Sequence, residues 1–235
     1  APAHALIVPH GSLRHAGAVT AAACGAVRIP RRCILVGPSH TGSWMPWSIM
    51  EHGAYRTPLG EVPIDVPGAE ALRARCPFLE GDAWAQQGEH AIEVVLPFLQ
   101  RLAPPDLAIV PIITGSRDEE EFKSLSEALA QVVRMQEEPV LLIASTDLSH
   151  YEPRERGAAH DRALLEAIRT LEGKALLRCV REQGIVMCGD GAAAAVLDAA
   201  RTLGASSATV VRYGTSADAG GDPGSTTGYA GVVIT

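Results

Sequence analysis

The stretch from residue 140 to residue 151 constrains the fold of this chain more than any other. Apolar residues begin directly after Pro139 and stop abruptly before Asp147 and His150. A short apolar run bounded in this way is typical of a strand that is buried on both faces. The ionisable groups therefore follow the carboxyl end of a core strand.

Two other apolar segments have the same design. Residues 6–10 end at His10, and residues 33–40 end at His40. In open α/β sheets the groups that carry out chemistry lie just beyond the carboxyl ends of the strands. Strands that lead to His10, His40 and His150 therefore predict one shared pocket.

Strand and helix patterns alternate along the rest of the chain. We expect strands at residues 5–9, 33–37, 107–113, 140–145, 209–213 and 229–234, and weaker ones at 47–50 and 62–64. We expect helices at residues 16–27, 68–75, 89–102, 119–136, 155–171, 173–183 and 192–203, with a kink or restart at Pro97. We also expect a turn at residues 37–42 and core positions for Trp44, Trp47 and Trp84. This alternation predicts a single α/β domain over residues 1–235, an αβα sandwich with a mixed, mostly parallel central sheet.

Composition limits the partners of such a domain. The chain has 235 residues, is 47% hydrophobic and 20% charged, and has a net charge of -7, which suits one large globular unit without an electrostatic footprint for nucleic acid or an anionic membrane. Five cysteines, an odd number, indicate reduced thiols in a cytoplasmic protein, and we find neither a signal segment nor a membrane span. We expect a small-molecule substrate, and this composition is also compatible with a homo-oligomer.

Histidines and one cysteine within two residues of glycine or proline indicate a metal site. His10, His40, His90 and Cys188 all have this setting. Two imidazoles and one anionic ligand leave positions open for substrate and oxygen, as in non-haem iron sites. A single histidine at a turn is more often structural, but four at strand ends favour a site. The chain lacks HExxH, CxxC and GxxxxGK motifs, which removes the main support for the commonest zinc hydrolase, zinc ribbon and P-loop interpretations.

Six sequence blocks together resemble the Memo family, whose bacterial members are often called AmmeMemoRadiSam system protein B. The blocks are GPSH at residues 37–40, YRTPL at 55–59, EHAIE at 89–93 followed by LP at 96–97, STDLSH at 145–150, MCG at 187–189 and GYAG at 228–231. The blocks are spread along the chain, so the resemblance extends over nearly all of it. The Memo fold is similar to that of class III (LigB-type) extradiol dioxygenases, which use Fe(II) to open catechol rings.

The resemblance implies roles for five residues. His40, His90 and Cys188 match the positions that face the metal in Memo proteins, and Asp147 and His150 match the acid/base side of the pocket. Where the dioxygenases place a glutamate as third ligand, this chain has Cys188, a softer ligand that favours copper, zinc or iron-sulfur chemistry.

Physical need suggests how the remaining groups would act. His150 is the natural acid/base, and Asp147 either orients its ring or caps the next turn. His10 would form a polar wall of the substrate pocket or donate a hydrogen bond to the substrate, and Glu93 is expected to be a solvated helix residue. Asp190 offers a carboxylate two residues after the cysteine, but the motif gives no reason to prefer it.

Three classes of function are therefore compatible with the sequence. The first is a non-haem iron oxidoreductase of extradiol dioxygenase type, acting on a small aromatic or chelating diol, with Fe(II) expected and copper or zinc as alternatives. The second is a metal-assisted hydrolase or amidase. The third is a non-catalytic module that binds a metal or a partner through a vestigial site.

Overall fold

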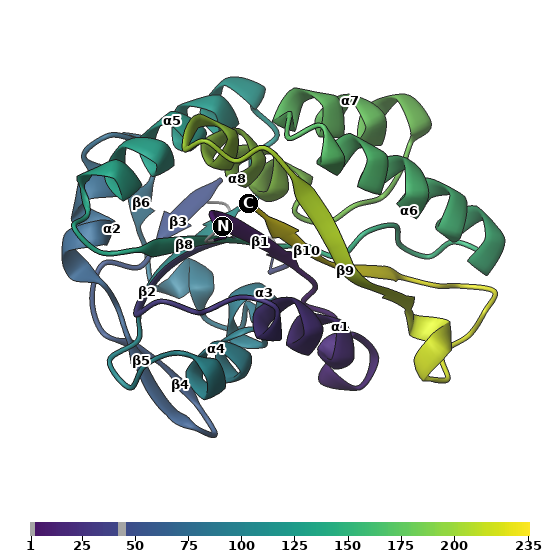
Figure 1. Cartoon of the computed structure of the whole chain (residues 1–235), viewed down its shortest axis with the longest axis horizontal. Helices are drawn as coiled ribbons and strands as arrows, with labels where there is room; N and C mark the ends of the chain where they lie inside the picture. The colour runs from purple at the N-terminus through teal and green to yellow at the C-terminus, as the bar shows by residue number, and fades with distance from the viewer. Residues whose placement is uncertain (1–2, 42–45) are drawn as a thin grey trace.

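The computed structural model describes residues 3–41 and 46–235 and contains one eight-stranded sheet (Figure 1). Its strands are β1 (Ala5–Val8), β2 (Arg32–Pro38), β3 (Trp47–Ile49), β6 (Glu80–Gly81), β7 (Ala108–Thr114), β8 (Val140–Ser145), β9 (Ala208–Thr215) and β10 (Gly228–Ile234). They lie in the order β6-β3-β7-β2-β8-β1-β10-β9. A separate two-stranded hairpin pairs β4 (Ala54–Thr57) with β5 (Gly60–Pro63).

The centre of the sheet is parallel and its outer parts are mixed. Strands β7, β2, β8 and β1 run parallel to their neighbours in that group, as β3 and β6 do to each other. The pairs β3/β7, β1/β10 and β10/β9 are antiparallel. The predicted mixed, mostly parallel sheet is therefore confirmed.

Helices cover both faces of this sheet. Helices α1 (Leu13–Gly25), α3 (His90–Glu93) and α4 (Leu96–Leu102) lie on one face, and α5 (Glu119–Met135) and α8 (Asp190–Thr202) lie on the other (Figure 1). Helix α7 (Gly173–Gln183) packs against α8, and α6 (Arg154–Arg169) packs against α7. Helix α2 (Val66–Arg73) contacts α5. There are also two short 3-10 turns, η1 (Trp84–Gln86) and η2 (Ser216–Ala219). None of the helices in the described ranges combines the length and the apolarity needed to cross a membrane.

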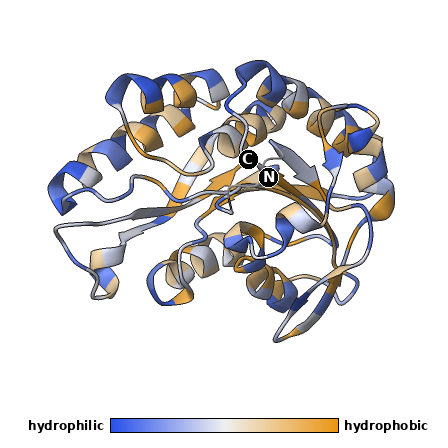
Figure 2. Ribbon diagram, turned by 180° about the vertical axis from the view of Figure 1, so that it is seen from behind, coloured by the Kyte–Doolittle hydropathy of each residue, from blue (hydrophilic) through white to orange (hydrophobic). Residues whose placement is uncertain are grey.

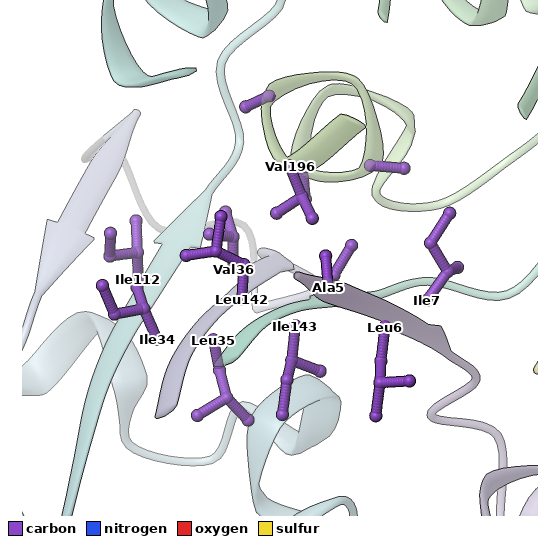
Figure 3. Packing of buried hydrophobic residues seen from close by; sticks show 14 of the residues in the cluster. Ala5, Leu6, Ile7, Ile34, Leu35, Val36, Ile112, Leu142, Ile143 and Val196 are labelled. Atoms are coloured by element: carbon purple, nitrogen blue, oxygen red, sulfur yellow. The ribbon is translucent and has the colours of Figure 1, made fainter. Parts of the chain in front are cut away.

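The core lies where the two helical layers meet the sheet. Hydrophobic residues gather on the strands and on the inward sides of the helices (Figure 2). Side chains alternate between the faces of the central strands: Leu6, Leu35 and Ile143 point to one side, and Ile7, Val36 and Leu142 to the side of α8 with Val196 (Figure 3). Because each of these side chains is buried, each stabilises the fold by roughly 1.5–3 kcal/mol.

Two local predictions can be compared directly with the structure. The restart at Pro97 is confirmed, because α3 and α4 are separate helices and Pro97 lies in the first turn of α4. Trp47 is fully buried, but the core position predicted for Trp84 is wrong, since this side chain is 78% exposed on η1. Two residues named in these predictions lie outside the described residues: Trp44, and Gly42, the last residue of the predicted turn.

Candidate metal centre

The strand register brings the residues after β1 and β8 to the same height at one edge of the sheet. Val8 pairs with Ser145, so His10 and Asp147 each follow a paired residue by two positions. The Asp147 Oδ1 atom accepts hydrogen bonds from the backbone N–H groups of His10, at 2.8 Å, and Gly11, at 3.1 Å. The carboxylate therefore joins the two strand ends.

Cys188 reaches the same edge from the loop before α8. Gly189 has a φ of +74°, and a Cβ there would lie 2.9 Å from the Ser145 carbonyl oxygen, so the turn favours glycine. The Thr146 hydroxyl donates to the Cys188 carbonyl, and the Asp147 N–H donates to the sulfur at 3.4 Å. These contacts hold the cysteine beside β8.

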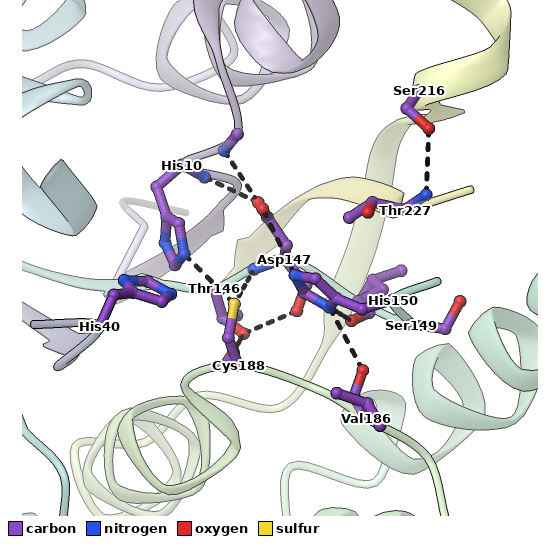
Figure 4. Close-up of polar contacts among 12 residues, drawn as sticks. His10, His40, Thr146, Asp147, Ser149, His150, Val186, Cys188, Ser216 and Thr227 are labelled. Atoms are coloured by element: carbon purple, nitrogen blue, oxygen red, sulfur yellow. Dashed lines mark hydrogen bonds and ion pairs between the residues drawn. The ribbon is translucent and has the colours of Figure 1, made fainter. Parts of the chain in front are cut away.

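All six side chains predicted for the site line one pocket of about 450 Å³. They are His10, His40, His90, Asp147, His150 and Cys188. Figure 4 shows five of them converging from the ends of β1, β2 and β8 and from the loop before α8. The prediction of one pocket at the carboxyl ends of these strands therefore agrees with the structure.

Three imidazole rings meet inside this pocket. The centroids of the His10 and His40 rings are 5.1 Å apart, and those of His10 and His90 are 5.5 Å apart. The rings of His40 and His90 are stacked, with centroids 4.6 Å apart and an interplanar angle of 27°. Three imidazoles this close together can serve as nitrogen ligands of one ion, because neutral imidazole is a common metal ligand.

Hydrogen bonds to Nδ1 set the tautomers of two of these rings. His10 Nδ1 lies 2.9 Å from the Ser145 hydroxyl, and that hydroxyl gives its own proton to the Ala91 carbonyl, so it accepts from His10. His40 Nδ1 donates to Glu89 Oε1 at 2.9 Å. The lone pair of each ring is therefore on Nε2, as required of a histidine that binds a metal through that atom.

His150 has the same tautomer for a different reason. Its Nδ1–H lies 2.9 Å from the Leu148 carbonyl oxygen and 3.2 Å from the Val186 carbonyl oxygen (Figure 4). Its Nε2 lies 3.9 Å from Asp147 Oδ2. Backbone carbonyls therefore orient the ring, and Asp147 is placed to stabilise a positive charge on it.

Burial keeps His10 and Cys188 neutral in the metal-free protein. Desolvation lowers the pKa of His10 to about 4, although the nearby Asp147 charge opposes this shift. Burial, reinforced by Asp147, raises the pKa of the Cys188 thiol above its ordinary value. Cys188 Sγ lies 3.2 Å from His10 Nε2, so the thiol donates a hydrogen bond to that nitrogen. A bound cation would replace that proton, because thiols that coordinate a metal are deprotonated.

Sequence reasoning missed one charged group, Glu89. Burial acts to raise its pKa, but hydrogen bonds from the side chain and backbone of His40 outweigh this and lower the pKa to about 2. The hydrogen bond to Glu89 in turn raises the pKa of His40. Its one sequence signal was its place just before α3, where its side chain caps the Ala91 N–H. Glu93 is exposed, as expected for a solvated helix residue.

Three overlapping groups of side chains can hold a metal ion, with ligand atoms in each group within 4.8 Å of one another. They are His10, His40 and Cys188; His40, Glu89 and His90; and Asp147, His150 and Cys188. Within the described ranges, His10 and not His90 shares such a group with His40 and Cys188. Nitrogen and sulfur donors of this kind suit iron, copper or zinc, so the side chains fit a bound transition metal, while direct binding by His90 stays a prediction.

Comparisons with known proteins agree with this architecture. A family model described as Memo-like protein matches residues 1–233. A MEMO1 family protein of Methanopyrus kandleri is 34% identical over 232 residues, covering 97% of this chain and 82% of the relative. One of Aquifex aeolicus is 34% identical over 230 residues, covering 98% and 85%. The crystal structure of an uncharacterized protein, JW3007, from Escherichia coli K12 has a TM-score of 0.68 and 16% identity, covering 98% of this chain and 99% of that one, and shows the fold alone.

Proposed function

The chain belongs to the Memo family, and from that premise we propose that it is a metal-dependent oxidoreductase acting on a small aromatic or chelating diol. The observation that carries this proposal is the convergence of His10, His40, His90 and Cys188 on one pocket. The pocket volume of about 450 Å³ is in the range typical of small-molecule sites.

His10, His40 and Cys188 would hold the ion, with His90 beside them. We expect Fe(II), which would supply Lewis-acid polarisation of a substrate oxygen and electrons for reaction with dioxygen. The Nε2 atoms of His10 and His40 carry lone pairs because their Nδ1 protons are engaged elsewhere. The ligand set therefore needs little rearrangement to bind.

His150 would carry the proton transfers. Its Nδ1 proton is held by two carbonyls, so Nε2 is the atom that can take a proton from a substrate hydroxyl. Asp147 Oδ2, at 3.9 Å, would stabilise the imidazolium that forms. General acid/base catalysis of this kind contributes about 10²- to 10⁴-fold to a rate.

The proposal is tested by metal analysis of anaerobically purified protein, followed by oxygen uptake with a panel of catechols. His150→Ala should lose turnover and keep its metal. His15→Ala is the matched control, because that residue is outside the pocket and, among the described residues, its ring bonds only to the nearby Ser12 hydroxyl. Absence of oxygen uptake with iron-loaded protein and every catechol would refute the oxidoreductase assignment.

The partly buried Cys188 thiol favours a second candidate, a copper- or zinc-binding protein without oxygenase activity. A thiolate is softer than the carboxylate of the dioxygenases, so it selects softer ions. Cys188→Asp discriminates between the two, because it should weaken copper binding more than iron binding. A protein that binds copper tightly and consumes no oxygen would support this second function.

We also propose a reducing, cytoplasmic location. All five cysteines are free, and three of them, Cys24, Cys33 and Cys76, are buried. Thiols in this number persist in compartments that keep them reduced. Expression in an oxidising compartment, with mass spectrometry of the thiols, tests whether Cys188 survives there unmodified.

A further inference from the structure

A buried carboxylate lies behind two of the histidines in the pocket. The Glu89 side chain is 1% exposed. It extends from the start of α3 to His40, which is 49 positions earlier in the chain, and Oε1 also lies 3.4 Å from His90 Nδ1. Glu89 therefore contacts both members of the stacked histidine pair.

The oxygens of this carboxylate are already used by the protein. Oε1 accepts from His40 Nδ1 at 2.9 Å and from the Ala91 N–H at 2.8 Å, and Oε2 accepts from the backbone N–H of His40. An ionised carboxylate has about four acceptor positions, of which these contacts fill both on Oε1 and one on Oε2, and His90 Nδ1 lies 3.4 Å from Oε1. Little capacity is left for a cation on this side chain.

We propose that Glu89 is a positioning residue of the metal centre and not one of its ligands. By accepting the Nδ1 proton of His40, it keeps the lone pair of that ring on Nε2, and its negative charge lies 3.4 Å from Nδ1 of His90. It thereby holds the His40 ring in its stacked position beside His90. The effect on metal affinity rests on the proposed function, whereas the effect on the tautomer does not.

The local backbone explains how one residue can do this. Glu89 is the N-cap of α3, with extended backbone angles (φ -84°, ψ 126°), and its side chain accepts from the second residue of that helix. The same carboxylate accepts from the loop after β2, so it ties the start of α3 to the end of β2. Partners of this kind behind metal-binding histidines typically change metal affinity by about 10- to 100-fold.

The tautomer is tested first, on metal-free protein. Long-range ¹H–¹⁵N NMR of the histidine rings distinguishes a proton on Nδ1 from one on Nε2. In the native protein we expect His40 to carry its proton on Nδ1, and in Glu89→Ala we expect that preference to be lost. Glu93→Ala is the matched control, because this exposed glutamate lies on the same helix, and it should leave the His40 signals unchanged.

Metal affinity is tested next, with Co²⁺ as the probe in calorimetry and visible spectroscopy. Glu89→Ala should bind one Co²⁺ per chain with about 10- to 100-fold weaker affinity. Glu89→Gln keeps one carbonyl acceptor for His40, so its tautomer should persist while affinity falls less. This second variant keeps the test available if the alanine variant fails to fold.

Two results would overturn the inference. One is an unchanged His40 tautomer in Glu89→Ala with unchanged Co²⁺ affinity. The other is an unchanged tautomer with a Co²⁺ spectrum that loses an oxygen ligand, which would make Glu89 a ligand. If the native protein binds no metal, the proposed function fails, and the tautomer experiment still decides whether Glu89 positions His40.

Discussion

Replacing Asp147 should separate its structural role from its role in proton transfer. Its Oδ1 accepts from the N–H groups of His10 and Gly11, which are otherwise at the end of β1 without strand partners. Asp147→Ala leaves the His10 donor in a buried place, since Asp147 is 4% exposed and His10 1% exposed, and the Gly11 donor in a half-buried one. Unsatisfied buried donors of this kind are costly.

The magnitude follows from these two hydrogen bonds. Hydrogen bonds to a charged group contribute about 1.5–3 kcal/mol each, so Asp147→Ala should lower the free energy of unfolding by at least about 3 kcal/mol. For a chain of this length this corresponds to a fall in Tm of about 6–12 °C. Asp147→Asn keeps a carbonyl oxygen for the same donors, so its loss should be about 1–2 kcal/mol.

The assay is urea unfolding of the metal-free protein, followed by circular dichroism. Asp222→Ala is the control, because its carboxylate also accepts from a backbone N–H, that of Gly224, but in an exposed loop. It should change the free energy of unfolding by less than about 0.5 kcal/mol. If Asp147→Ala unfolds at the same urea concentration as the native protein, the carboxylate does not join the strand ends.

Four further predictions concern the pocket and its surroundings. The pKa of His10 is about 4 in the folded protein and 6.5 in the unfolded chain, so only the unfolded chain takes up this proton as the pH falls from 6.5 to 4. The free energy of unfolding of the metal-free protein, measured with urea, should therefore fall by about 3 kcal/mol over that range, and by less in His10→Gln. Gly191→Ala places a Cβ 2.0 Å from Phe122 Cζ and should cost about 1–3 kcal/mol in the same assay, with partial recovery when Phe122→Leu is added. Metal at 100 times its Kd should stabilise the native protein by about 2.7 kcal/mol in thermal melts, and His40→Ala should abolish this gain. Cys188→Ser should weaken zinc binding in a competition titration with a chromophoric chelator, and equal affinity in the two proteins would remove the thiol from the ligand set.

The placement of the pocket could be predicted because it depends on short-range patterns. Apolar runs before His10, His40 and Asp147 identify buried strands, and parallel pairing of β1, β8 and β2 then puts the following residues at one edge. The broken helix at Pro97 could be predicted for the same reason, since proline acts on its own backbone. Local chemistry was therefore sufficient for the fold and for the composition of the pocket.

The hydrogen-bond partners in the pocket could not be predicted, because they come from distant parts of the chain. Glu89 reaches His40 across 49 positions, and Ser145 reaches His10 across 135. No periodicity encodes such pairs. The predicted burial of Trp84 was wrong for a related reason, since a short 3-10 turn has no repeating sequence pattern that shows which side is buried.

The position of β1 has a consequence for biosynthesis. This strand is made before both of its neighbours, because it lies between β8 and β10, and β10 begins only at Gly228. Until Gly228–Ile234 has been synthesised, Ala5–Val8 can pair on one side at most, and the loop that carries Cys188 is not yet held by a finished sheet. The proposed metal centre should therefore be complete only after β10 has joined the sheet.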